Sequence, residues 1–299
     1  MDDRSRSMDS ATSSSATTLL MAIDLARRHL VDAGSSTPRL DAEVLLRHVL
    51  GLDRTRLIVH LHEPLASSDL DRYLGLVGRR AAGEPVAYLT GEREFMGLAF
   101  VVRSGVLIPR PETELLVEWA LSRLRDLSVA TVLDVGTGSG AIALSLASHR
   151  PPSRHGRILA SDISSAALRV AAENRSRLGV VDRVDLVQGD LGSWCAEPVD
   201  LLLANLPYLR PDQLTDNLEL VAEPRLALAG GVDGLDLVRQ LLADTPRLLA
   251  PGGALALEID PSQVGAAREL AGAALSDGKV TVQNDLAGLP RIVIADRAG

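Results

Sequence analysis

The residues best suited to chemistry form a short turn, Asn-Leu-Pro-Tyr, at positions 205–208. The side-chain amide of Asn205 offers a hydrogen-bond acceptor and a donor, so it can read the edge of another planar amide or amidine. Leu206 precedes a proline, which favours extended backbone and aims its carbonyl in one direction. Pro207 fixes the next backbone angle, and the Tyr208 ring supplies a flat face for stacking. In isolation, an ordinary strand followed by a proline turn would look the same.

A second motif, Asp-Val-Gly-Thr-Gly-Ser-Gly, lies upstream at 134–140. Its glycines allow a tight turn that a ligand can approach closely, and the free N–H groups of the helix that follows attract a carboxylate. The dinucleotide fingerprint Gly-x-Gly-x-x-Gly does not match, because the third glycine comes one residue early. The pattern fits an S-adenosylmethionine loop better. The loop residues predicted to hold this donor are Asp134, Gly136, Thr137, Gly138, Ser139 and Gly140.

Two aspartates follow at the ends of the next two predicted strands. Asp162 lies about twenty residues after the glycine loop, where a carboxylate can accept hydrogen bonds from both ribose hydroxyls. Asp190 could accept from an adenine amino group, although a solvated turn aspartate is the alternative. Because parallel strands bring their carboxyl ends to one edge of a sheet, the glycine loop, both aspartates and the turn at 205–208 predict a single site.

Other candidate sites fail on spacing or stay open. Ser139 is not a nucleophile elbow, because that motif requires glycine where Thr137 and Ala141 stand. His60 and His62 have no cysteine partner, so we expect no metal. Glu-Pro-Arg at 223–225 is consistent either with a wall of the site or with a surface loop.

From about residue 128 the chain alternates strand and helix, which is typical of a parallel sheet covered on both faces. Strands are predicted at 131–135, 157–162, 184–188, 199–204, 253–259, 279–283 and 290–296. Helices are predicted at 140–149, 164–178, 234–249 and 262–275. The Gly-Leu-Pro turn at 288–290 indicates a hairpin, so the last strand is expected to run antiparallel.

The first third of the chain does not show this alternation of strands and helices. Residues 1–18 are polar and predict a disordered tail. Helices at 19–30, 38–50 and 67–82 predict a small helical bundle over 19–89, and a β-hairpin linker is expected at 90–108. The main domain would then cover 109–299. Its opening Pro-Arg-Pro segment at 109–111 is consistent with a rigid elbow, a ligand-facing lid or both.

Composition narrows the class of protein. The 299 residues carry a net charge of −8 and no long basic run, which argues against clamping a nucleic-acid backbone. The single cysteine excludes an internal disulfide. We find no apolar run of about 18 residues and no secretory signal, so neither a membrane span nor export is expected. These features favour a cytoplasmic enzyme.

Taken together, five segments resemble the protein-(glutamine-N5) methyltransferases that modify peptide-chain release factors. They are Ile-Pro-Arg-Pro-Glu-Thr-Glu at 108–114, the glycine loop, Asn-Leu-Pro-Tyr, Glu-Pro-Arg-Leu-Ala-Leu at 223–228 with Gly-Gly-Val-Asp-Gly, and Asp-Leu-Ala-Gly-Leu-Pro-Arg at 285–291. The resemblance covers nearly everything after residue 19. It implies a Rossmann-like class I methyltransferase fold, with a mostly parallel seven-stranded sheet whose last strand is antiparallel, preceded by a helical bundle.

The resemblance also implies S-adenosylmethionine as methyl donor and, as substrate, the glutamine of a Gly-Gly-Gln loop in a release factor. Carried over, residues 136–140 and Asp162 hold the donor, Leu191 packs near its adenine, and residues 205–208 hold the glutamine, with Asn205 bordering the donor as well. The helical bundle is expected to dock the protein substrate.

One departure from the family pattern concerns position 206, where the family has proline and this chain has leucine. The carbonyl that accepts from the substrate is a backbone group and is retained, but the fixed φ of a proline is lost. Two other functions stay open on the residues. One is an adenine-N6 methyltransferase acting on nucleic acid, and the other is a non-catalytic nucleoside-binding protein.

Overall fold

The computed structural model describes residues 17–125, 127, 129–151, 155–214 and 218–299. The chain divides into two compact units, Met1–Thr90 and Gly91–Gly299. The predicted tail at 1–18 lies outside the described residues except for its last two positions. No helix in the described ranges combines the length and the apolar character that crossing a bilayer requires.

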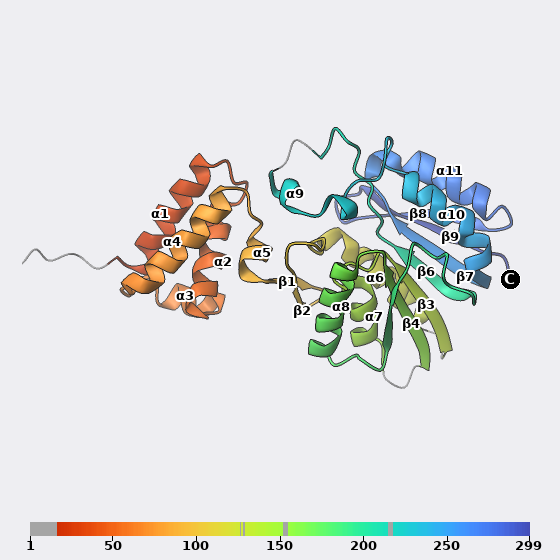
Figure 1. Cartoon of the computed structure of the whole chain (residues 1–299), viewed down its shortest axis with the longest axis horizontal. Coiled ribbons are helices and arrows are strands. Elements are labelled where there is room, and N and C mark those ends of the chain that lie inside the picture. Colours follow the sequence, from red (N-terminus) through yellow and green to blue (C-terminus); the bar gives the residue numbers. More distant parts are fainter. Residues whose placement is uncertain (1–16, 126, 128, 152–154, 215–217) are drawn as a thin grey trace, which may run out of the picture. The chain divides into compact units, whose positions relative to one another are not determined.

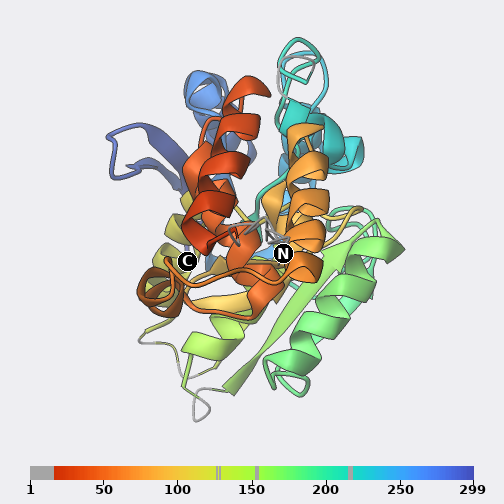
Figure 2. The ribbon, with the colours of Figure 1, turned by 90° about the vertical axis from the view of Figure 1, so that its left-hand side faces the viewer.

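The first unit is a helical bundle with its own core. Its helices are α1 (Leu19–Asp32), α2 (Pro38–Leu50), α3 (Arg54–Val59), α4 (Ser67–Ala81) and α5 (Val86–Thr90). Helices α1, α2 and α4 pack side by side around fully buried Leu30, Leu45 and Tyr73 (Figures 1 and 2). The three predicted helices are present. The sequence patterns missed α3 and α5, because helices of five or six residues are too short to show a period of 3.6 residues.

The second unit opens with an antiparallel hairpin of β1 (Glu92–Phe95) and β2 (Leu98–Val101). Its two-residue turn, Met96-Gly97, has positive φ at both positions, which matches the right-handed twist of the strands. The rings of Phe95 and Phe100 meet edge to face with their centroids 6.0 Å apart, and both side chains are buried in the core of this unit. The segment expected as a linker therefore packs as part of the second unit.

A seven-stranded sheet forms the centre of the second unit. Its strands are β3 (Val129–Val135), β4 (His155–Asp162), β5 (Val184–Gln188), β6 (Val199–Ala204), β7 (Leu249–Glu258), β8 (Lys279–Asn284) and β9 (Pro290–Asp296). They lie in the order β5-β4-β3-β6-β7-β9-β8, and β9 alone runs opposite to the other six. The predicted fold class is confirmed. Strand β7 starts earlier than predicted because Leu249 already pairs with Val199, before an irregularity at Pro251–Gly253.

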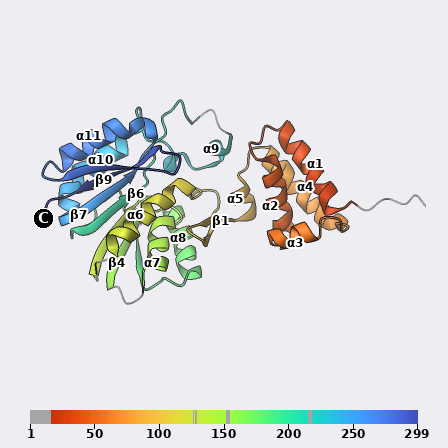
Figure 3. The ribbon, with the colours of Figure 1, turned by 180° about the vertical axis from the view of Figure 1, so that it is seen from behind.

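Helices cover both faces of this sheet (Figures 1 and 3). One face carries α6 (Glu114–Leu124), α7 (Ala141–His149) and α8 (Ser165–Arg177), and the other carries α10 (Asp236–Leu248) and α11 (Val264–Ala274). Shorter elements are α9 (Leu218–Ala222) and the 3₁₀ turns η1 (Pro111–Thr113), η2 (Arg225–Ala227) and η3 (Pro261–Gln263). The last four residues of the central strand β6, Leu201–Ala204, are all apolar and buried, as expected when both faces are covered.

The order of the strands determines where a ligand can bind. From β3 the chain proceeds outward to β4 and β5, and it then returns to the other side of β3 as β6. At such a switch point the connections leave in opposite directions and open a crevice at the carboxyl ends of the strands. Val135 of β3 pairs with Ala204 of β6, so Gly136 and Asn205 follow directly from neighbouring strand ends.

Candidate functional site

The glycine loop after β3 depends on backbone conformations that only glycine adopts without strain. Gly136, Gly138 and Gly140 all have positive φ, between 57° and 87°. The N–H groups of Gly136 and Thr137 both donate to the Ser161 carbonyl at 2.9 Å, which ties the loop to the end of β4. A Cβ on Gly140 would lie 2.6 Å from Leu144, whereas one on Gly138 would meet nothing within 4 Å. Gly138 therefore faces open space.

Several of the predicted donor residues lie beneath this loop. Asp134 has no exposed surface. Its Oδ2 accepts from the Thr137 hydroxyl at 2.6 Å and from the Ala143 N–H at 3.3 Å. Ser139 is also buried, and its carbonyl accepts from the side chain of Asn174. Asp134, Thr137, Ser139 and Gly140 thus shape the loop, while Gly136 and Gly138 line the cavity above it.

The carboxylate of Asp162 forms part of the cavity wall. Its Oδ2 accepts from the Gly138 N–H at 2.9 Å, and its Oδ1 accepts from the Ser164 N–H at 2.8 Å. Burial raises the pKa of Asp162, while these two backbone hydrogen bonds act in the opposite direction. Each oxygen keeps a lone pair that can accept from a ligand hydroxyl.

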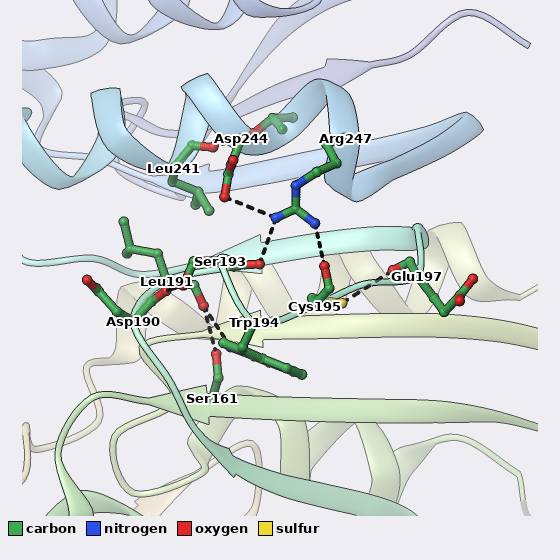
Figure 4. A network of polar contacts seen from close by, with 12 residues as sticks. Ser161, Asp190, Leu191, Ser193, Trp194, Cys195, Glu197, Leu241, Asp244 and Arg247 are labelled. Atoms are coloured by element: carbon green, nitrogen blue, oxygen red, sulfur yellow. Dashed lines mark hydrogen bonds and ion pairs between the residues drawn. The ribbon is translucent and has the colours of Figure 1, made fainter.

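The loop that follows β5 supplies another part of the wall (Figure 4). Leu191 has a φ of 47°, a strained value for a residue with a branched side chain. Its carbonyl accepts from Trp194 Nε1 at 3.0 Å and from Ser161 Oγ at 3.4 Å. Arg247 of α10 donates to the backbone carbonyls of Gly192 and Cys195 in the same loop. The strained residue is therefore held in place at the cavity, which it lines together with the exposed Asp190.

The Asn-Leu-Pro-Tyr turn lies directly beside the glycine loop. The side chain of Leu206 is buried, and a Cβ on Gly136 would lie 3.4 Å from it. Asn205 Nδ2 donates to Thr113 Oγ1 at 3.0 Å. Tyr208 Oη donates to the buried carboxyl of Glu258 at 3.4 Å. Among the backbone groups that the structure describes, none donates to the Leu206 carbonyl.

Gln263 and the glycine-rich loop at 230–234 contact the same turn from the outside. Gln263 Nε2 donates to the Tyr208 carbonyl at 2.8 Å. A Cβ on Gly230 would lie 2.6 Å from the carbonyl oxygen of Pro207, and one on Gly234 would lie 2.2 Å from that of Tyr208. The backbone contact is too close for any side chain at these two positions.

Two hollows meet at the turn. The larger, about 850 Å³ counted to its open mouth, lies over the glycine loop and reaches Asp162, Asp190 and Leu191. The smaller, about 440 Å³, is bordered by Arg110, Tyr208 and Leu220. Both are lined by Asn205, Leu206 and Pro207. The two hollows therefore adjoin at this turn.

The two segments that the sequence left open are joined in the structure. Glu223 is buried, accepts from the Ile108 N–H at 2.9 Å and forms an ion pair with Arg110. Pro224 borders the larger hollow and Arg110 the smaller one. The Pro-Arg-Pro segment and the 223–225 segment thus form one wall of the site, although neither offers a group that reacts.

Sequence reasoning missed two residues of this region, Thr113 and Glu258. Burial raises the pKa of Glu258 to about 7. A carboxylate that ends a predicted strand at the ligand-binding edge was a usable signal for Glu258. The motif at 108–114 contains Thr113, but nothing in it indicates the contact with Asn205, which is 92 residues away in the chain.

Two family models match the chain. Residues 21–91 match the "PrmC N-terminal domain", and residues 132–224 match the "Methyltransferase domain". The first match covers most of the helical unit, and the second runs from β3 to Pro224 at the cavity wall.

Similar proteins span nearly the whole chain. A protein named release factor glutamine methyltransferase from Moorella thermoacetica is 47% identical over 94% of this chain and 99% of its own length. One of the same name from Cereibacter sphaeroides is 43% identical over 89% of this chain and 94% of its own. Among solved structures, the hMettl16 catalytic domain in complex with MAT2A 3′UTR hairpin 6 aligns with a TM-score of 0.56 at 16% identity, over 73% of this chain and 81% of that one. That likeness concerns the fold alone.

Proposed function

The chain belongs to the release factor glutamine methyltransferase family, as its motifs predicted, and we propose that it methylates the side-chain amide nitrogen of a glutamine in a peptide-chain release factor. The methyl donor in this proposal is S-adenosylmethionine, and the target is the glutamine of a Gly-Gly-Gln loop.

The observation that carries the proposal is the position of the Asn-Leu-Pro-Tyr turn between two hollows. The larger hollow has the walls that a nucleoside-bearing donor requires, and the smaller one is of a size for a side chain. Asn205 lines both. A carboxamide held by Asn205 from the smaller hollow would present its nitrogen toward the larger one.

The residues of the larger hollow fit such a donor. Asp162 keeps lone pairs for the two ribose hydroxyls, and Gly138 leaves open space above the loop. Asp134 Oδ1 has no hydrogen-bond partner among the described residues, which leaves one carboxyl oxygen unpaired under the loop where the donor's amino-acid end would bind. When bound, S-adenosylmethionine supplies an electrophilic methyl group on a sulfonium.

The chain's own contribution would be to position a poor nucleophile. An amide nitrogen attacks weakly because its lone pair is delocalised into the carbonyl. We assign Asn205 Oδ1 and the Leu206 carbonyl as acceptors for the two N–H groups of the glutamine amide, with Tyr208 bordering the same hollow. Holding the nitrogen in line with the methyl can supply about 7 kcal/mol of the barrier. Both acceptors also stabilise the positive charge that grows on nitrogen before its proton leaves.

Leucine at position 206 is compatible with this role. Its side chain is buried against the glycine loop, so packing orients the residue where the family relies on a proline ring. The carbonyl that would accept from the substrate belongs to the backbone and does not depend on the side chain.

The helical unit is assigned to docking of the protein substrate. It matches the N-terminal domain model of this family, and all of the lining residues of both hollows lie in Gly91–Gly299. The chemistry would thus belong to one unit and the recognition of the release factor to the other.

The deciding experiment offers labelled S-adenosylmethionine with a release factor, duplex DNA or RNA. We expect label on the release factor glutamine alone, and we expect Asn205→Ala to lose turnover while binding the donor normally. Asn284→Ala, an exposed substitution at the end of β8, serves as the matched control. Label on adenine would establish the nucleic-acid alternative, and donor binding without transfer to any substrate would establish a non-catalytic protein.

A further inference from the structure

Gln263 is a buried side chain that the methyl transfer itself does not use, and it lies behind the Asn-Leu-Pro-Tyr turn. It ends η3 and is 5% exposed. Its Nε2 donates to the carbonyls of Tyr208 at 2.8 Å and Asp233 at 3.2 Å. Its Oε1 accepts from the Asp260 N–H at 3.3 Å. One side chain thus connects the turn, the glycine-rich loop at 230–234 and the segment that leads into α11.

These three contacts fix which end of the Gln263 amide faces the turn. The carbonyls of Tyr208 and Asp233 can only accept a hydrogen bond, whereas the Asp260 N–H can only donate one. A reversed amide would place its oxygen against two carbonyl oxygens and its NH₂ group against an N–H. The NH₂ end must therefore face Tyr208. A carboxylate at this position could accept from Asp260 but could not donate to Tyr208.

The glycine-rich loop closes around the same contact. Gly234 has a φ of 79°, and a Cβ on it would lie 2.1 Å from Gln263 Nε2. A Cβ on Gly230 would lie 2.6 Å from the carbonyl oxygen of Pro207. Glycine at both positions lets the backbone of the loop reach the turn directly. The Gly-Gly-Val-Asp-Gly motif, which the reaction chemistry does not explain, thus supports the same anchor as Gln263.

We propose that Gln263 is a positioning residue that holds the carboxyl end of the turn, so that the Leu206 carbonyl is presented to the substrate amide. The inference rests on the proposed function of the site. Strand pairing already fixes the other end of the turn, because Ala204 pairs with Val135 and with Leu257. Leu206 has no ring to fix its own φ. The direction of its carbonyl therefore depends on how firmly the chain is held on both sides of it.

A purely structural role for Gln263 makes a different prediction. Its Oε1 and the Asp260 side chain form a capping box at the start of η3. Glutamate forms this box as well as glutamine does, because the box needs only an acceptor at this position. Donation to Tyr208 requires the amide NH₂, which glutamate lacks. Gln263→Glu therefore keeps the capping contact and removes the contact with the turn.

The test measures kcat, KM for a release factor and donor Kd in the full chain. Gln263→Glu should lower kcat by about tenfold or more, because a small displacement of the acceptor misaligns the reacting nitrogen. KM and donor Kd should stay within about threefold, since Gln263 is not among the described residues that line either hollow. Gln263→Met removes all three hydrogen bonds at similar length and should lose at least as much kcat. Gln240→Glu, the same change at an exposed position of α10, should match wild type.

Wild-type kcat in Gln263→Glu would overturn the inference, because the capping contact alone would then account for the residue. A loss of donor affinity as large as the loss of kcat would also overturn it, since the whole site would then be disturbed. Circular dichroism establishes that each variant is folded at the assay temperature, and Gln263→Glu decides if Gln263→Met is not. Wild-type protein that binds donor but labels no release factor would instead refute the proposed function.

Discussion

At the scale of single residues, the site depends on carboxylates whose surroundings differ. Asp162 is held at the cavity wall by two backbone N–H groups, and Glu258 lies behind the Asn-Leu-Pro-Tyr turn. Asp134 is fully buried beneath the glycine loop, which it braces through Thr137. Burial raises the pKa of Asp134 to about 7, and the nearby charge of Asp162 acts in the same direction. Ionising this carboxyl under the loop therefore costs stability.

That cost predicts a pH dependence that Asp134→Asn should remove. The ordinary pKa of this carboxyl is 3.8, so between about pH 4 and pH 7 the unfolded chain binds fewer protons than the folded one. Free energy of unfolding should then fall as pH rises through this range. The free energy of unfolding of Asp134→Asn, relative to that of wild type, should rise by about 1 kcal/mol or more between pH 5 and pH 8.

The measurement is urea unfolding followed by tryptophan fluorescence. Both tryptophans, Trp119 and Trp194, lie in the second unit, so the signal reports that unit. Asp182→Asn, at an exposed carboxyl, is the control and should leave the pH dependence unchanged. If the free energy of unfolding changed with pH in the same way in wild type and in Asp134→Asn, Asp134 would not be the source of the pH dependence.

At the scale of elements, two segments far apart in the chain form the outer wall of the site. Glu223, just after α9, holds the Pro-Arg-Pro segment through Arg110 and the Ile108 N–H. The same segment continues through η1, whose last residue Thr113 contacts Asn205. The wall and the Asn-Leu-Pro-Tyr turn are therefore linked through a single stretch of backbone.

We expect Glu223→Ala to destabilise the second unit by about 2 kcal/mol, because it leaves the buried Ile108 N–H without an acceptor. Donor affinity should weaken as well, since Leu107 and Pro224 line the larger hollow. Urea unfolding and donor titration check both effects. Glu173→Ala, which breaks the exposed ion pair with Arg103, should cost less than about 1 kcal/mol. Equal losses of unfolding free energy in Glu223→Ala and Glu173→Ala would show that Glu223 does not support this wall.

At the scale of the whole molecule, the chain divides into two units with separate cores. One buried cluster belongs entirely to the helical unit, and the other two belong to Gly91–Gly299. Both hollows are lined by residues of the second unit alone. A unit with its own core and its own site can fold and bind a ligand without its neighbour.

A chain consisting of residues 91–299 should therefore bind S-adenosylmethionine with a Kd within about threefold of the full chain. Its kcat/KM for a release factor should fall by more than about tenfold, because the docking contacts of the helical unit are lost. Calorimetry and the labelling assay measure the two quantities. Loss of donor binding would show that the helical unit supports the donor site, and unchanged kcat/KM would show that it does not dock the substrate.

The fold class and the edge at which the site lies can be inferred from the order of the amino acids alone. Alternating apolar runs predicted the strands and helices, and the crossovers that parallel strands require bring residues 136–140, Asp162 and Asn205 to one edge. The family motifs added the expected reaction. These features are local in the chain or follow from general rules of sheet topology, so they can be inferred without coordinates.

The contacts that support the site are visible only in the folded protein. It placed Asp134 beneath the loop, brought Glu223 to Arg110, and joined Asn205 to Thr113 and Tyr208 to Glu258. These pairs are separated by 50 to 113 residues along the chain. No periodicity or propensity records such contacts, because they exist only once the sheet and its flanking loops have packed together.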